Sequence, residues 1–168
     1  MNIADYWIDR LQLTSHPEGG YFKELYRAQE AIDRDALPQR YASQRTFSTS
    51  IYFLLKGDEY SNFHRLASDE TWHFHTGTSA TVYEIEANTG KLIEHQIGPN
   101  FEKGEQFQVM IRAGNWFAAK VNDPNSFILV GCTVAPGFEF EDSELAICKE
   151  LIETYPHHQS LIEKFTTS

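Results

Sequence analysis

The feature that most constrains this fold is a series of short strand-like segments, separated by turns, that runs from residue 47 to residue 135. The segments cover residues 47–55, 62–66, 70–75, 80–86, 92–97, 106–111, 116–121 and 126–135. Turn residues separate several of them, at Lys56-Gly57-Asp58, Asn88-Thr89-Gly90, Ala113-Gly114-Asn115 and Asp123-Pro124-Asn125. Because no helical pattern alternates with these segments, the sequence predicts an all-β antiparallel sandwich or barrel rather than a parallel α/β sheet.

Helices are expected only at the two ends of the chain. Residues 2–13 show an amphipathic helical pattern, with Asn2 as the N-cap and apolar side chains at Ile3, Tyr6, Trp7 and Leu11. Near the C-terminus, Pro156 ends a second helix, for which Ser143 is the expected cap and Leu145, Ile147, Leu151 and Ile152 form the apolar stripe. Between the first helix and the strands, residues 16–22 (HPEGGYF) predict a tight turn into an edge strand, and residues 28–44 predict a long loop.

The alternation of residues 47–55 assigns two faces to this strand. The face expected in the core carries Phe47, Thr49, Ile51, Phe53 and Leu55. The opposite face, with Ser48, Ser50, Tyr52 and Leu54, is expected to line a half-polar cavity.

Length and composition exclude several classes of protein. The chain has 168 residues, about the size of one domain, so a single domain over residues 1–168 is expected. A net charge of −10 with dispersed basic residues argues against nucleic-acid binding. The N-terminal MNIADYWIDR lacks the basic start of a signal peptide, and no apolar run approaches the roughly 18 residues of a membrane span, which predicts a cytoplasmic protein without a membrane partner. Cys132 and Cys148 are expected to be free thiols.

The densest group of reactive side chains lies in residues 57–77 (GDEYSNFHRLASDETWHFHTG), which contain His64, Glu70, His73 and His75. Imidazole nitrogens and a carboxylate oxygen can hold a divalent metal if they converge and leave one position open for substrate. In an ideal pleat, however, Glu70 faces one side of its strand while His73 and His75 face the other. A β-bulge would be needed to turn His73 toward Glu70.

The same segment resembles the first motif of the cupin superfamily, in which a glycine precedes a His-x-His pair, a glutamate and a closing glycine. Gly57, His64, Glu70 and Gly77 take these places, and Leu66 stands at the second histidine. The later cupin motif, Pro-x-Gly followed by His, is also altered, with Arg112 at the proline, Gly114 kept and Phe117 near the histidine. Of the four metal ligands usual in the superfamily, the resemblance leaves only His64 and Glu70.

More narrowly, the chain looks like the small cupins of unknown function known as the DUF985 (cupin_5) subfamily. The resemblance covers nearly the whole chain and rests on HPEGGYFKELYR, RTFSTSIYFLL, FHRLASDETWHFHTG and LVGCTVAPGFEFEDSELA, in this order. It implies a double-stranded β-helix, the cupin jelly-roll barrel, with short N- and C-terminal helices. It also implies a homodimer, for which exposed strand edges give a physical motive. The resemblance supplies no established reaction, although the fold is shared with sugar-nucleotide epimerases and with metal-dependent isomerases and oxygenases.

We expect a small polar metabolite, carbohydrate- or nucleotide-derived, to bind in the barrel mouth around His64 and Glu70. Without a metal, the Glu70 carboxylate would orient the His64 imidazole as an acid/base pair, and Tyr52 or Tyr21 would be the opposing acid, as in an isomerase or epimerase. Arg65 and Arg112 are expected to bind an anionic part of the ligand. The remaining expected ligand contacts are Ser50, Trp72, His73, Trp116 and Phe117.

Other interpretations of these residues stay open. No cofactor is expected, because two protein ligands hold a catalytic divalent ion poorly, but His73 would complete an iron or manganese site with His64 and Glu70. The pocket could also belong to a noncatalytic module that binds or senses a small molecule. The structural alternatives are a plain hydrogen bond between His64 and Glu70, core packing for Trp72, Trp116 and Phe117, and surface or turn positions for His16, His75 and His95.

Overall fold

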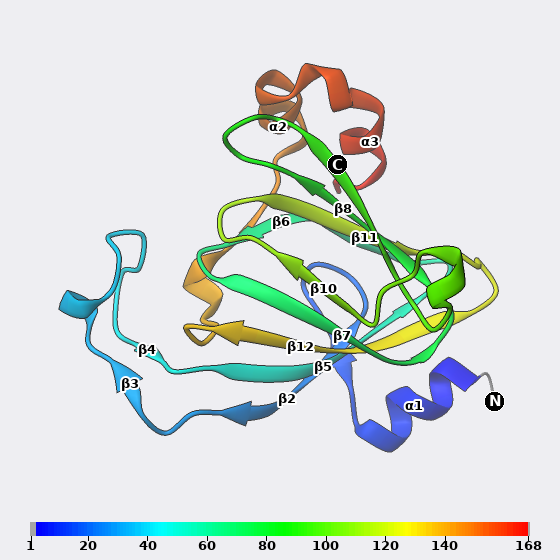
Figure 1. The fold of residues 1–168 in the computed structure, drawn as a ribbon, viewed down its shortest axis with the longest axis horizontal. Coiled ribbons are helices and arrows are strands. Elements are labelled where there is room, and N and C mark those ends of the chain that lie inside the picture. Colours follow the sequence, from blue (N-terminus) through cyan, green and yellow to red (C-terminus); the bar gives the residue numbers. More distant parts are fainter. Residues whose placement is uncertain (1–2, 168) are drawn as a thin grey trace.

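The computed structural model describes residues 3–167, whose strands form two facing antiparallel sheets that build a double-stranded β-helix (Figure 1). Within that range the first sheet has the strand order β1-β2-β5-β12-β7-β10, and the second has the order β13-β6-β11-β8-β9. The first sheet contains β1 (Thr14–Ser15), β2 (Tyr21–Arg27), β5 (Thr49–Lys56), β7 (Asp69–Gly77), β10 (Gln108–Ile111) and β12 (Phe127–Ala135). The second contains β6 (Tyr60–Leu66), β8 (Ala80–Ile85), β9 (Leu92–Ile97), β11 (Trp116–Val121) and β13 (Ser143–Leu145). The predicted all-β fold class is confirmed.

The helices lie at the two ends of the chain, as the sequence predicts. They are α1 (Ile3–Leu11), α2 (Cys148–Thr154) and α3 (Gln159–Lys164), with short 3-10 turns at Arg34–Ala36, Phe101–Lys103, Phe140–Asp142 and Pro156–His158. The expected N-cap, Asn2, lies outside the described residues. The predicted long loop is an arm that extends from the barrel in Figure 1 and carries the hairpin of β3 (Ala31–Ile32) and β4 (Arg45–Thr46). No helix within residues 3–167 is long and apolar enough to cross a membrane.

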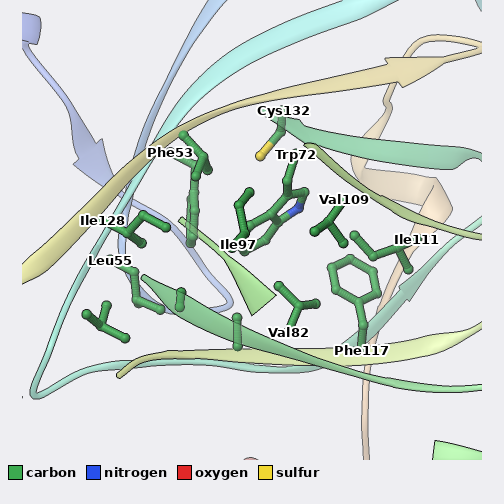
Figure 2. Close-up of a cluster of buried hydrophobic side chains, with 14 of the residues drawn as sticks. Phe53, Leu55, Trp72, Val82, Ile97, Val109, Ile111, Phe117, Ile128 and Cys132 are labelled. Carbon is green, nitrogen blue, oxygen red and sulfur yellow. The ribbon is translucent and has the colours of Figure 1, made fainter. Parts of the chain in front are cut away.

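The main core fills the space between the two sheets (Figure 2). Phe53 and Leu55 from β5 and Trp72 from β7 meet Val82 from β8 and Phe117 from β11 there, and each is almost fully buried. Alternation along each strand sends every second side chain into this space, because successive residues of a strand point to opposite faces.

Helices cover the outer faces of both sheets. Leu54 and Leu129 on the first sheet pack with Ala4 of α1, and Phe63 and Trp116 on the second sheet belong to a cluster completed by α2 and α3. Both sheets are therefore apolar on two sides, which makes the inward face harder to recognise from sequence.

This covering corrects the expectation for residues 47–55. Phe47 precedes β5 and is 49% exposed, while Thr49 and Ile51 line a cavity inside the barrel. The face predicted to line the cavity, which carries Tyr52, instead packs against the region of α1. The face expected in the core does point inward, with Phe53 and Leu55 in the core, and only the expected position of the cavity is wrong.

The C-terminal helix begins later than predicted. Residues 143–145 form β13, which pairs with β6, and α2 begins only at Cys148. Ser143 is therefore not a helix cap, and its hydroxyl donates to Glu18 Oε1 at 2.7 Å. The predicted end before Pro156 is confirmed, since α2 ends at Thr154. Cys132 and Cys148 are both free thiols, also as expected.

A buried arginine joins the arm to the segment that follows β12. Arg45 is fully buried and binds Asp142 through two hydrogen bonds, Nε to Oδ2 at 2.7 Å and Nη2 to Oδ1 at 2.6 Å. Nη2 also donates to Glu141, and Nη1 donates to the backbone carbonyls of Ser43 and Gln44. These bonds raise the pKa of Arg45 above its usual value, so the group stays charged. This network fixes residues 137–142, part of which forms one wall of the cavity described below.

We expect Arg45→Lys to lower the free energy of unfolding by about 3 kcal/mol, because an ammonium cannot replace the bidentate contact and leaves Asp142 partly unpaired. Urea denaturation measures this loss, and hydrogen exchange should quicken at the Gly137 and Asp142 amides. The control is Arg112→Lys at an exposed ion pair with Asp69, which should cost less than about 1 kcal/mol. Equal losses in the two variants would contradict a special role for the Arg45 network.

Candidate functional site

A cavity of about 80 Å³ lies between the two sheets, and His64 of β6 and Glu70 of β7 both line it. The two side chains come from different sheets and are nearly buried, with 3% and 8% of the residue exposed. β2, β5 and β12 complete the wall of the first sheet, and residues 138–140 close one side. The cavity is small beside the roughly 300–1,000 Å³ of common ligand pockets. It therefore has room for only a small molecule or the end of a larger one.

The turn at residues 16–20 brings His16 and Glu18 into this cavity. Gly19 and Gly20 have φ angles of +105° and +77°, and a Cβ on Gly19 would lie 2.0 Å from the Tyr60 carbonyl oxygen. Only glycine permits this close approach to β6 in that backbone conformation. The turn is held there by the Glu18 carbonyl, which accepts from the backbone amide of Asn62 at 2.8 Å.

The carboxylate that contacts His64 is Glu18, not Glu70 as the sequence pattern suggests. His64 Nε2 lies 3.1 Å from Glu18 Oε2, and His64 Nδ1 lies 2.7 Å from the Asn62 carbonyl oxygen. A carbonyl only accepts hydrogen bonds, so Nδ1 carries a proton. His64 Nε2 is then the nitrogen that lies next to Glu18 Oε2, while Glu18 Oε1 accepts from Ser143. The two side chains form a buried acid/base pair.

His16 is held in one orientation beside this pair. Its Nδ1 accepts a hydrogen bond from the Glu18 backbone amide at 3.2 Å, and its ring contacts Phe22 edge-on at a centroid distance of 4.6 Å. Burial lowers the pKa of His16, which outweighs the opposite effect of the Glu18 carboxylate. The sequence predicts a surface or turn position for His16, and the residue lies in the turn but with its side chain 8% exposed against the cavity.

Glu70 lines the cavity from strand β7 and is nearly buried. Burial raises the pKa of the Glu70 carboxyl to about 7, although the charge of His64 and the hydrogen bond from the Trp72 indole act in the opposite direction. Trp72 Nε1 donates to Glu70 Oε2 at 3.1 Å. Burial also raises the pKa of the neighbouring Cys132 thiol well above its usual value, so this group stays protonated. Glu70 is thus able to exist in both protonation states near neutral pH.

Arg27 lies in the cavity wall between two acidic side chains. It binds Glu24 on its own strand at 2.9 Å and Glu139 across the cavity wall at 2.5 Å, and it donates to the Phe138 carbonyl. The positive charge of Arg27 is therefore already matched by two carboxylates. Because Glu18 and Glu70 also line the cavity, the site as a whole carries more acidic than basic groups.

The structure does not bring the remaining predicted residues of the first sheet into the cavity. Tyr21 and Tyr52 belong to the outer cluster near α1, where the Tyr21 hydroxyl donates to Glu59. Ser50 lies on the same outer face by alternation with Thr49 and Ile51. His73 also points outward and bonds Thr133 Oγ1 through Nε2 at 3.1 Å, as the ideal pleat predicts.

Five further predicted residues also lie outside the cavity wall. Phe117 is in the core, where its ring lies 4.0 Å from that of His64. Trp116 belongs to the outer cluster under α2 and α3, and the Arg65 guanidinium lies over its ring and pairs with Glu144. Arg112 is exposed and pairs with Asp69. Trp72 contributes indirectly, through its hydrogen bond to Glu70.

The donor set does not fit the metal site of the cupin motif. Leu66 and Phe117, which stand at or near two histidine positions of that motif, are buried apolar residues. Both nitrogens of His64 are occupied by Asn62 and Glu18, and His73 lies on the other side of its strand. Within residues 3–167 no group of three or more His, Cys, Asp or Glu side chains could hold a metal ion. The side chains of this cavity therefore differ from the ligand set of the cupin metal motif.

Comparison with known proteins assigns the chain to a family but not to a reaction. Residues 5–146 match the family described as Cupin_5, cupin superfamily (DUF985). An uncharacterized protein of Saccharomyces cerevisiae is 29% identical over 145 residues, which span 80% of this chain and 71% of that protein. A crystal structure of a Shewanella oneidensis protein is 38% identical, with a TM-score of 0.87 over 99% of this chain and 98% of that chain. A hypothetical protein from Leishmania major is 31% identical, with a TM-score of 0.88 over 98% of this chain and 99% of that one.

A more distant likeness shows the fold alone. Oxalate decarboxylase from Bacillus subtilis is 13% identical, with a TM-score of 0.55 over 90% of this chain and 36% of that chain. At that identity the shared barrel says nothing about shared chemistry.

The raised pKa of Glu70 predicts a pH-dependent loss of stability. Its protonated form is favoured in the folded protein, so this stabilisation is complete below about pH 4.5 and is lost as the pH rises to about 7. Relative to Glu70→Gln, which stays neutral, the wild type should lose about 3 kcal/mol over this range. Urea denaturation at several pH values measures the difference.

The control is Glu102→Gln, which removes an exposed carboxylate from the turn at Phe101–Lys103. It corrects for the loss of one negative charge. The difference in the free energy of unfolding between the wild type and Glu70→Gln could instead stay constant from about pH 4.5 to pH 8. That result would show that burial does not perturb the pKa of Glu70.

Proposed function

The chain belongs to the Cupin_5 (DUF985) family of the cupin superfamily, and from that premise we propose that it binds a small polar metabolite in the barrel cavity and transfers protons on it without a metal, as an isomerase or epimerase does. The family name supplies no reaction, so the proposal rests on the side chains that line the cavity.

The observation that carries the proposal is the presence of two separate proton-carrying groups in one buried cavity. Glu18 Oε2 lies 3.1 Å from His64 Nε2, and Glu70 has a pKa of about 7. A group that titrates near the working pH serves equally well as an acid or as a base. Moving a proton off one position and onto another needs two such acid/base groups in different environments, and Glu18 beside His64 supplies the second position in this cavity.

The reaction that fits is proton transfer at a carbon next to a carbonyl. The Glu18 carboxylate, oriented by His64 and Ser143, removes the proton, and the electron pair of the broken C–H bond forms an enolate. Protonated Glu70 then returns a proton to carbon while the carbonyl is restored. Glu18–His64 finishes with one proton more and Glu70 with one fewer, and exchange with water resets both. Neither oxidant nor metal is required.

The cavity favours a neutral ligand over an anion. Arg27 is already matched by Glu24 and Glu139, and the remaining carboxylates would repel a phosphate or a carboxylate. Carboxylates instead accept hydrogen bonds from hydroxyl groups. The rings of Phe22 and Phe138 line the same cavity and can cover the C–H face of a sugar. A neutral hydroxylated carbonyl compound therefore matches the lining best.

We expect the protein to catalyse deuterium exchange next to the carbonyl of neutral ketoses in D₂O, followed by ¹H NMR. A panel from dihydroxyacetone to the keto-hexoses tests the size limit set by the cavity. Glu18→Gln and Glu70→Gln should each lower the exchange rate by about 10²–10⁴-fold, because each removes one proton-transfer group. Binding, measured by calorimetry, should weaken far less.

His157→Asn is the matched control, since His157 is exposed in the turn at Pro156–His158, and it should leave the rate unchanged. Binding of a panel member without any exchange would contradict catalysis and indicate a binding module. Loss of exchange in His73→Asn would contradict the metal-free proposal, because His73 could act only as part of a rearranged metal site.

A further inference from the structure

We propose that His16 is a neutral hydrogen-bond donor that binds the carbonyl oxygen of the ligand through Nε2, which makes a carbonyl group the feature that this cavity selects. The inference rests on the proposed proton-transfer function and extends it, since it identifies a catalytic residue that neither the cupin motif nor the sequence pattern indicates.

The backbone fixes which nitrogen of His16 carries the proton. The Glu18 backbone N–H donates to His16 Nδ1 at 3.2 Å, so Nδ1 must present a lone pair. In a neutral imidazole the proton then resides on Nε2. The hydrogen bond spans only two residues and belongs to the tight turn closed by Gly19 and Gly20, so it is set by local backbone geometry.

The Nε2–H group has no acceptor of its own in the protein. Among residues 3–167, no hydrogen bond from another residue reaches His16 Nε2, although His16 lines the cavity and its side chain is 8% exposed. The ring is held by Phe22 at a centroid distance of 4.6 Å and by Phe53 at 5.9 Å, both edge-on. A rigidly held donor that lines a cavity and makes no hydrogen bond within the protein is well suited to a ligand oxygen.

Burial keeps the His16 ring neutral against the charge of the Glu18 carboxylate. Glu18 Oε2 lies 3.5 Å from Nδ1 and favours protonation, but His64 acts against it and Glu18 is already engaged by His64 and Ser143. Burial has the largest effect and lowers the pKa of His16. A neutral imidazole is a weak acid, so it can stabilise an enolate oxygen without giving up its proton.

In the reaction, His16 acts on the oxygen while the other groups act on carbon. As Glu18 removes the C–H proton, the electron pair moves through the new C=C bond onto the carbonyl oxygen, and the Nε2–H bond to that oxygen strengthens. When Glu70 returns a proton to carbon, the electron pair returns and the carbonyl is restored. The His16 proton stays on Nε2 throughout, so no additional proton or electron acceptor is required.

The decisive experiment compares dihydroxyacetone with glycerol, which has the same carbon skeleton and no carbonyl. In ¹⁵N-histidine-labelled protein, two-bond ¹H–¹⁵N spectra near pH 7 should show His16 as the neutral Nε2–H tautomer. Dihydroxyacetone should shift the His16 Nε2 resonance. It should also bind about tenfold more tightly than glycerol, because one hydrogen bond contributes about that factor to the affinity. An imidazolium, an Nδ1–H tautomer, equal binding of the two compounds or no saturable binding of dihydroxyacetone would each overturn the proposal.

Two variants separate the donor from the fold of the turn. In His16→Asn the side-chain oxygen can still accept from the Glu18 amide, but the Nε2 donor is lost. Deuterium exchange should then fall about 10²-fold through kcat, and the preference for dihydroxyacetone over glycerol should disappear. In His16→Gln the amide nitrogen can approach the Nε2 position. This variant should therefore recover part of the exchange rate and part of the preference for dihydroxyacetone. Unchanged thermal midpoints in the two variants exclude unfolding as the cause.

The outcomes distinguish this inference from the function on which it rests. Exchange that persists at the wild-type rate in His16→Asn would overturn the role of His16 and leave proton transfer standing. Selective binding of dihydroxyacetone that depends on His16, without exchange in the wild type, would support the carbonyl contact and contradict the catalytic proposal.

Discussion

The arrangement of the cavity depends on the contact between the turn at residues 16–20 and strand β6. The Glu18 carbonyl accepts from the Asn62 backbone amide, and the Asn62 carbonyl in turn accepts from His64 Nδ1. One residue of β6 therefore fixes both the position of Glu18 and the orientation of the imidazole that Glu18 contacts. A buried carboxylate without such partners would be too costly to keep ionised. Ser143 on β13 completes the set, so the pair exists only when both edges of the barrel are in place.

Much of the fold follows from the sequence because turn residues and alternation are local signals. The short spacing of strands and turns gives the β-barrel, and the pleat of β7 correctly sends His73 away from Glu70. Local signals fail where both faces of an element are covered. The sequence places Tyr52 and Ser50 in the cavity because their face of β5 is half-polar, and only the packing of α1 shows that this face is the outer one.

The candidate site is harder to predict because its main contacts are between residues far apart in the chain. The sequence draws attention to His64 and Glu70, but the carboxylate in contact with His64 lies in a turn 46 positions earlier, at Glu18. The one sequence signal for the position of Glu18 is the Gly19-Gly20 pair that follows it. In the sequence this pair indicates only an ordinary turn, and the structure shows that Gly19 is needed because the turn lies close to the Tyr60 carbonyl. The sequence does not indicate the contact of Ser143 with Glu18, because the spacing of Leu145 and Ile147 is typical of a helix. In the structure this segment pairs with β6 and forms a strand.

The apolar residues at the altered motif positions also set the acidity of the cavity. Leu66 lines the cavity and Phe117 packs on the His64 ring, so apolar side chains stand where the cupin motif would place imidazoles. Imidazolium groups or a cation at those positions would hold the Glu70 pKa down, whereas apolar surroundings raise it to about 7. The same two positions that alter the metal-binding motif thus leave its glutamate with a raised pKa. His64 loses its place as a ligand in the same way, because its free nitrogen now contacts Glu18. In physical terms, the altered motif describes a different kind of site and not merely a weakened one.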